Sequence, residues 1–114
     1  MNIDFVLLLD IYGELLSKGR REALDLRYNS DLSLSEIAVE MGGVSRQSVN
    51  DFIKKGEKHL IELERVLGMA ERHKTVGAKL ARANEIVAEL KRDGGGERVT
   101  ELGELLNGIG EAFK

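Results

Sequence analysis

Residues 34–58, LSEIAVEMGGVSRQSVNDFIKKGEK, carry the pattern of two helices joined by a tight turn. Apolar residues recur at three- and four-residue steps on both sides of the Gly42-Gly43 pair, as they do on the buried faces of helices. This spacing predicts a helix-turn-helix, whose second helix offers its outer face to a groove or a partner. The residues expected to face the core are Ile37, Ala38, Met41, Val44, Val49, Phe52 and Ile53.

The sequence also indicates where these two helices begin. Ser33 and Glu36 form S-x-x-E before an apolar run, which predicts a capping box at the start of the first helix. Ser45 is expected to cap the second helix by accepting a hydrogen bond from a first-turn N–H. Gly42 and Gly43 make the turn one residue longer than in most such units. Glycine suits this insertion because a positive φ costs it little.

The outer face of the second helix is polar and partly basic. Arginine, glutamine and asparagine side chains can make bidentate contacts to purine edges in the major groove. Asp51 lies in the middle of this face and would repel phosphate, which favours the alternative of a solvated helix face on a scaffold. The candidate nucleic-acid or partner-binding residues on this helix are Arg46, Gln47, Asn50, Lys54 and Lys55.

A second basic group precedes the helix-turn-helix, where helices are expected over residues 3–16 and 18–28. Arg20 and Arg21, together with Lys18 and Arg27, could hold a phosphate backbone or could simply form a solvated helix start. The whole chain has 17 basic and 20 acidic residues, and this net charge of −3 argues against tight nucleic-acid binding. Residues 45–58 contain four basic and two acidic residues, so a local, salt-sensitive patch of +2 is expected there.

Three segments resemble the small bacterial YlxM-like proteins, which are usually encoded beside the genes for the signal recognition particle protein and its receptor. They are FVLLLDIYGELLS (Phe5–Ser17), ALDLRYNSDLSLSEIA (Ala23–Ala38) and VSRQSVNDFIKKGEK (Val44–Lys58). The last is the most specific, because SRQ-x-V-x-D-x-IK is close to a signature of that family. The Gly42-Gly43 pair departs from the family pattern. More broadly, ALDLRY, LSLSEIA and VSRQSV resemble region 4 of sigma factors, which binds promoter DNA.

The resemblance implies an accessory protein of the signal recognition particle pathway that contacts the particle's RNA or its GTPase, or a regulator of that operon. The helix-turn-helix itself supports a second hypothesis, a dimeric transcriptional regulator that binds duplex DNA. A third hypothesis is a protein–protein interaction module in which the helix-turn-helix is only a scaffold. The acidic net charge and Asp51 favour this third hypothesis.

The composition excludes several classes of protein. Apolar residues make up 42% and charged residues 32%, as in a folded globular domain. The absence of cysteine excludes disulfides, and His59 and His73 lie far apart in the sequence, so no metal site is expected. No phosphate loop, G-x-G-x-x-G or nucleophile elbow is present, so we expect a non-enzymatic protein without cofactors. No signal peptide or membrane span is visible, which predicts a cytoplasmic protein that does not contact membranes.

The rest of the chain lacks proline and strand patterns, which predicts an all-α fold. We expect a helix-turn-helix domain over residues 1–68, in which the second helix of the motif continues to about Gly68. Residues 69–114 are expected to form a helical hairpin around Gly94-Gly95-Gly96 that packs or dimerises, and we predict a homodimer. The apolar seams of this hairpin are Val76, Leu80, Ala83, Val87 and Leu90, followed by Val99, Leu102, Leu106, Ile109 and Phe113.

Overall fold

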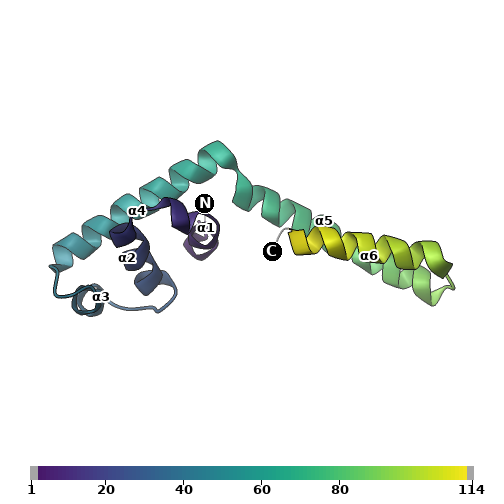
Figure 1. The fold of residues 1–114 in the computed structure, drawn as a ribbon, viewed down its shortest axis with the longest axis horizontal. Coiled ribbons are helices and arrows are strands. Elements are labelled where there is room, and N and C mark those ends of the chain that lie inside the picture. The colour runs from purple at the N-terminus through teal and green to yellow at the C-terminus, as the bar shows by residue number, and fades with distance from the viewer. Residues whose placement is uncertain (1–2, 113–114) are drawn as a thin grey trace. The chain divides into compact units, whose positions relative to one another are not determined.

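The computed structural model describes residues 3–112, and every regular element in this range is helical. The prediction of an all-α fold is therefore confirmed. The chain divides into two units, one up to Ala70 and one from Glu71 on (Figure 1). The elements are α1 (Phe5–Tyr12), a short 3-10 helix η1 (Gly13–Leu15), α2 (Lys18–Tyr28), α3 (Leu34–Glu40), α4 (Arg46–Leu67), α5 (Met69–Arg92) and α6 (Gly96–Ala112).

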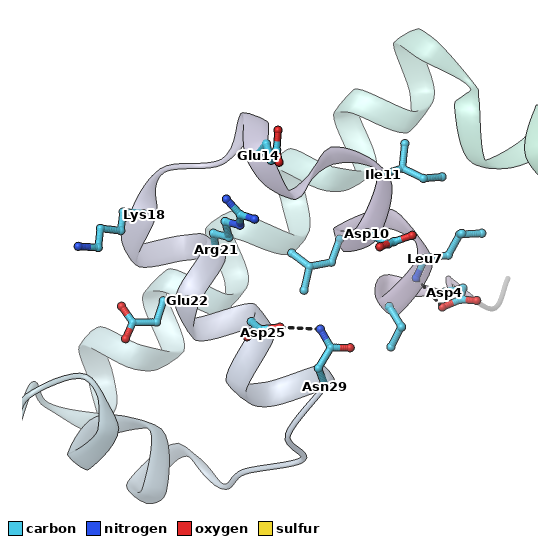
Figure 2. A pocket seen from close by; sticks show the side chains of 12 residues that line it. Asp4, Leu7, Asp10, Ile11, Glu14, Lys18, Arg21, Glu22, Asp25 and Asn29 are labelled. Carbon is cyan, nitrogen blue, oxygen red and sulfur yellow. Dashed lines mark hydrogen bonds between the residues drawn. The ribbon is translucent and has the colours of Figure 1, made fainter. Parts of the chain in front are cut away.

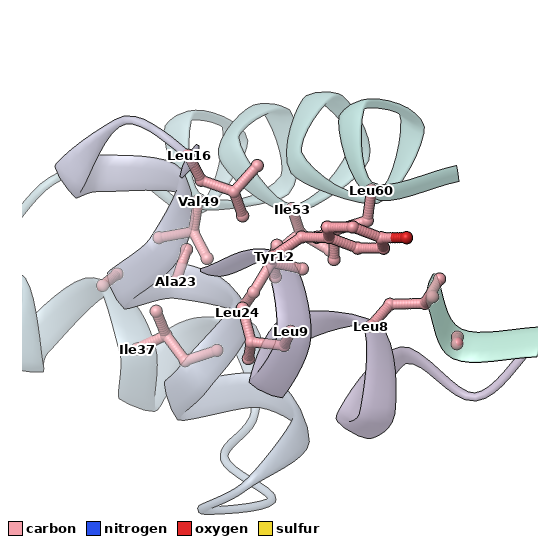
Figure 3. Packing of buried hydrophobic residues seen from close by; sticks show 12 residues of the cluster. Leu8, Leu9, Tyr12, Leu16, Ala23, Leu24, Ile37, Val49, Ile53 and Leu60 are labelled. Atoms are coloured by element: carbon pink, nitrogen blue, oxygen red, sulfur yellow. The ribbon is translucent and has the colours of Figure 1, made fainter. Parts of the chain in front are cut away.

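Helix α4 is the element on which the first unit is built, because α1, α2 and α3 all contact it. Its buried residues Val49, Ile53, Gly56 and Leu60 recur at steps of three and four and form one continuous face. Figure 3 shows this face meeting side chains from the other three helices. Full burial of each large aliphatic side chain contributes about 1.5–3 kcal/mol. The largest side chains that are completely enclosed are Leu24, Ile37, Val49 and Leu60.

The crossing of α2 and α4 depends on a glycine in α4. A Cβ atom placed on Gly56 would lie 2.6 Å from Cδ1 and 3.2 Å from Cγ of Leu24. A second glycine, Gly19 on α2, lies against the ring of Phe52, where a Cβ would come within 2.9 Å of the ring. The two helices can therefore approach this closely only because each lacks a side chain at one contact point.

The first helix is shorter than the sequence predicts. A continuous helix was expected over residues 3–16, but α1 ends at Tyr12 and the chain tightens into η1. Leu16 then turns to an extended conformation (φ −85°, ψ 156°), and its N–H donates to the carbonyl of Gly13 at 3.1 Å. The tighter turn leaves Leu15 59% exposed, although the predicted apolar stripe included it, while Leu16 is buried.

The junction between α4 and α5 is held by a partly buried cluster of hydrogen bonds. Helix α4 ends at Leu67, as the sequence predicts, and Gly68 terminates it in the left-handed conformation (φ 62°). The Tyr12 hydroxyl donates to Oε1 of Glu64 at 2.7 Å and accepts from the N–H of Met69 at 3.0 Å. The same Oε1 accepts from the N–H of Ala70 at 2.9 Å. Two of the first N–H groups of α5 are thereby satisfied.

The Tyr12 phenol of this cluster stays protonated near neutral pH. Desolvation, and next the hydrogen bond to the Glu64 carboxylate, raise the pKa of the Tyr12 phenol above its ordinary value of 10.0. The hydroxyl therefore remains a donor to Glu64 throughout the physiological range.

The second unit contains α5 and α6, which form a helical hairpin. Gly94 and Gly96, with φ of 86° and 72°, form the connection between α5 and α6. The helices pack closely where Gly103 meets Val87, since a Cβ on Gly103 would lie 3.3 Å from Cγ1 of Val87. Of the predicted seams, Phe113 lies outside the described residues. Three other seam residues remain at least 43% exposed, namely Leu90, Leu102 and Ile109.

Replacing Gly56 with alanine should destabilise the first unit. Overpacking against Leu24 costs roughly 1–3 kcal/mol, which outweighs the roughly 0.5–1 kcal/mol that alanine gains over glycine inside a helix. We expect Gly56→Ala to lower the free energy of unfolding by about 1 kcal/mol or more, as measured by thermal and urea denaturation followed by circular dichroism. The matched control is Gly77→Ala on α5, where the added Cβ meets no atom within 4 Å. This control should not lower stability, and an unchanged or raised stability for Gly56→Ala would contradict the close crossing.

Candidate nucleic-acid interface

Helix α3 and the turn after it have the geometry that the sequence predicts. The Ser33 hydroxyl accepts from the N–H of Glu36 at 3.2 Å, and the Glu36 carboxylate accepts from the N–H of Ser33 at 3.0 Å, which completes the capping box. The hydrogen bond from the Ser33 N–H, and next an interaction with the Ser33 side chain, lower the pKa of the Glu36 carboxyl group below its ordinary value. At the other end, the N–H groups of Gly42 and Gly43 donate to the carbonyls of Val39 and Ala38, at 3.1 and 2.9 Å.

This pair of bonds is the Schellman arrangement at a helix end, and it explains the second glycine. Gly42 and Gly43 have φ values of 89° and 87°, a region that residues with a Cβ seldom adopt. Gly43 therefore accommodates the additional residue of the turn by adopting a positive φ, as Gly42 does. Val44 follows, partly buried against the core, and the chain then enters α4.

Ser45 caps α4 and orders its first turn. Its hydroxyl accepts from the N–H of Ser48 at 3.0 Å and lies 2.9 Å from the Ser48 hydroxyl. No acidic residue lies in the first turn of α4. The N–H dipoles at this exposed helix start, together with the Arg46 side chain, therefore favour contact with an anion.

The structure brings together three of the five predicted α4 residues. Gln47, Asn50 and Lys54 line a shallow hollow, and the exposed residues Arg46 and Lys55 lie outside its lining. Two residues of this hollow, Ser45 and Ser48, were not among the predicted binding residues. Ser45 was expected only as a cap, and helical spacing could have identified Ser48, which lies one turn before Asp51.

Asp51 also lines the hollow, but its charge is partly offset. Its Oδ2 lies 3.1 Å from Nζ of Lys55, one helical turn away. Both side chains are more than half exposed, at 56% and 57%, so this i,i+4 pair contributes only about 0.3–0.5 kcal/mol. The pair reduces the repulsion that Asp51 would exert on phosphate, and it also occupies one of the predicted binding lysines.

The structure separates the second basic group from the α4 hollow. Arg21 and Lys18 line a different groove, between α1 and α2. Arg20 is half-buried, and its Cβ lies 3.4 Å from the position a Cβ would take on Gly56. Arg27 donates to the carbonyl of Leu32 at 2.9 Å and so ties the α2–α3 loop. None of these four residues lines the hollow on α4.

Residues 3–112 contain no group of three or more acidic, histidine or cysteine side chains arranged to hold a metal ion. His59 is half-buried on α4, and its Nδ1 makes no hydrogen bond within the described structure. Among the described helices, none is long and apolar enough to cross a membrane.

The chain also matches a known protein family. Residues 2–95 match the family described as YlxM/p13-like helix-turn-helix proteins, UPF0122. The chain belongs to this family. The resemblance that the sequence motifs indicate is therefore confirmed.

Relatives in this family include UPF0122 proteins from several bacteria. The chain is 50% identical to the Clostridium kluyveri protein over 70 residues, which are 61% of this chain and 62% of the relative's length. It is 47% identical to the Acetivibrio thermocellus protein over 85 residues, 75% of this chain and 69% of the relative. It is 39% identical to a Thermoanaerobacter protein over 99 residues, 82% of this chain and 84% of the relative.

The helix-turn-helix of this UPF0122 protein is formed by α3, the Gly42-Gly43 turn and α4. In such motifs the second helix is the one that enters a groove, and its N-terminal residues make the contacts. In this chain those residues are exposed and carry the hollow described above. The first two turns of α4 are therefore the candidate interface.

If this face binds nucleic acid, replacing Asp51 with asparagine should strengthen the interaction. A carboxylate about 7 Å from a phosphate costs about 0.6 kcal/mol at the dielectric constant of water, so we expect Asp51→Asn to raise affinity roughly threefold per nearby phosphate. The gain should shrink as salt is added. Fluorescence anisotropy with labelled RNA or duplex DNA measures this change.

Glu62→Gln is the matched control. Glu62 also carries one negative charge on α4 and pairs with a basic side chain, Arg65. It lies eleven residues from Asp51, roughly 16 Å along the helix and beyond the screening length at physiological salt. This control should leave affinity unchanged. Equal effects of the two variants would show that only the overall charge matters, and no effect of Asp51→Asn would place the ligand elsewhere.

Proposed function

We propose that this protein is a nucleic-acid-binding accessory or regulatory protein that contacts its ligand through the first turns of α4. The observation that carries the proposal is the exposed, capped start of α4, where Arg46, Gln47, Asn50 and Lys54 lie free of the core. These side chains combine donors for base edges with positive charge for phosphate. The family's helix-turn-helix character supports the same face.

The ligand that we propose is the RNA of the signal recognition particle, with the particle's GTPase as a neighbouring contact. The resemblance of residues 5–58 to the YlxM-like proteins motivates this choice. An RNA ligand also suits the charge of the chain. A patch of +2 on a protein of net charge −3 favours recognition of a shaped, local site over extended contact with duplex phosphates.

Duplex DNA is the second candidate, because the α3–α4 unit presents a second helix in the manner of DNA-binding motifs. The homodimer expected from the sequence remains a prediction, and a dimeric DNA regulator would require it. Exposed apolar residues on the second unit support such an association, since Ile86, Leu105 and Ile109 are at least 41% exposed.

A double variant tests the proposed face directly. Arg46→Ala with Lys54→Ala removes two positive charges from α4 and touches no core residue. We expect affinity for the particle's RNA to fall by roughly tenfold or more, and the slope of log affinity against log salt to fall by roughly 1.4–1.8, because two phosphate contacts are lost. Fluorescence anisotropy at low and moderate salt gives both quantities, with random duplex DNA measured beside the RNA.

The matched control is Lys79→Ala with Arg98→Ala, which removes one lysine and one arginine from exposed positions on α5 and α6. It should bind as the unaltered protein does. Binding to RNA that persists at moderate salt supports the particle's RNA as ligand. Preferential binding to duplex DNA transfers the proposal to the second candidate. No binding to either, or equal losses in the two double variants, contradicts a nucleic-acid function for α4.

A further inference from the structure

We propose that the groove between α1 and α2 binds a basic, amphipathic helix of a partner protein. This groove is a second surface of the first unit, and none of the residues that line it belongs to α4. Its volume is about 1130 Å³, and Figure 2 shows its walls formed by α1 and η1 on one side and by α2 on the other.

The floor of the groove is apolar and partly open to solvent. Val6 is 47% exposed, and Leu7 and Ile11, on the same helix, are only half-buried. Leu7 and Ile11 lie one helical turn apart on α1, and Val6 is next to Leu7. Their burial by a partner would contribute about 25 cal/mol per Å² of apolar surface. Such a strip fits the apolar face of a helix, the helix-in-groove mode of recognition.

The rim of the groove is strongly acidic. Five acidic residues and two basic residues line it, so the net charge of the lining is −3. The net charge of the whole chain is also −3. Positive and negative charges are therefore equal in number among the remaining residues, and the excess negative charge of this protein lies in the groove. The acidic residues are Asp4, Asp10, Glu14, Glu22 and Asp25.

Within residues 3–70, the part of the first unit that the structure describes, no ion pair involves these carboxylates. Among the described residues, neither Lys18 nor Arg21 forms an ion pair with them. Asp4 accepts from the N–H of Leu7 at 3.0 Å and Asp25 accepts from the Asn29 amide at 2.6 Å, so these two are held in place by uncharged groups. An acidic rim around an apolar floor is complementary to lysine or arginine side chains flanking a leucine-rich stripe.

The dimensions set the length of the partner segment. Helix α1 has eight residues and therefore spans about 12 Å. A partner helix would rest on it for roughly two turns, with apolar residues at three- and four-residue steps against Val6, Leu7 and Ile11. The acidic rim also excludes nucleic acid from this surface, so the groove and the α4 hollow would take ligands of opposite charge.

The probe for this proposal is a labelled synthetic helix with leucine on one face and lysine on the other, compared with a helix that has glutamate in place of lysine. Fluorescence anisotropy with the full chain should detect binding of the lysine helix and not of the glutamate helix. Asp10→Lys with Glu22→Lys, one residue from each wall, should weaken binding of the lysine helix by roughly tenfold or more. If circular dichroism shows that this variant does not fold, Asp10→Asn with Glu22→Gln makes the same test, because it removes the two negative charges without adding positive ones.

Two matched controls separate the groove from general attraction. Glu101→Lys with Glu104→Lys makes the same charge change on α6 and should leave binding unchanged. Val6→Ser should weaken binding several-fold, whereas Val39→Ser, at a 75% exposed position on α3, should not. The proposal is overturned if the lysine helix does not bind, if the Asp10 and Glu22 variants bind it normally, or if the α6 variant loses as much affinity. Self-association of the protein alone that these groove variants abolish would instead identify a second copy as the occupant.

Discussion

The structure of the first unit depends on the close packing of α4 against three other helices. Val49, Ile53 and Leu60 supply the apolar face of this contact, and Gly56 supplies the space that lets α2 approach. Because one face of α4 is fully used in this way, its opposite face is left to solvent. The residues available for binding at the start of α4 follow directly from which residues the core requires.

The two exposed surfaces of this unit have opposite chemistry. The start of α4 combines helix N–H dipoles with amide side chains, and residues 45–58 together carry a net charge of +2. The groove between α1 and α2 combines an apolar floor with an excess of carboxylates. An acidic chain can therefore still present a site for an anionic ligand, because its negative charge is gathered elsewhere. Such a division is compatible with the RNA ligand and the partner helix proposed above.

Much of this fold could be predicted from the sequence, since helix periodicity, the Ser33 and Ser45 caps and the Gly68 stop are all local signals. The change from α-helix to 3-10 helix at Gly13 could not be predicted from the sequence, because it depends on how Leu16 packs into the core. The candidate site was predicted only in part. Helical spacing placed Gln47, Asn50 and Lys54 on one face, but the position of Arg21 in a separate groove depends on tertiary packing.

The central claim is that α4 carries the nucleic-acid interface of a family defined by its helix-turn-helix. Amide chemical shifts of the labelled protein, followed by NMR while the RNA of the signal recognition particle is added, test this claim most directly. The account predicts perturbations concentrated at residues 45–58, with the groove residues of α1 and α2 unaffected. Perturbations centred on α1 and α2, or no perturbation at residues 45–58, would contradict it.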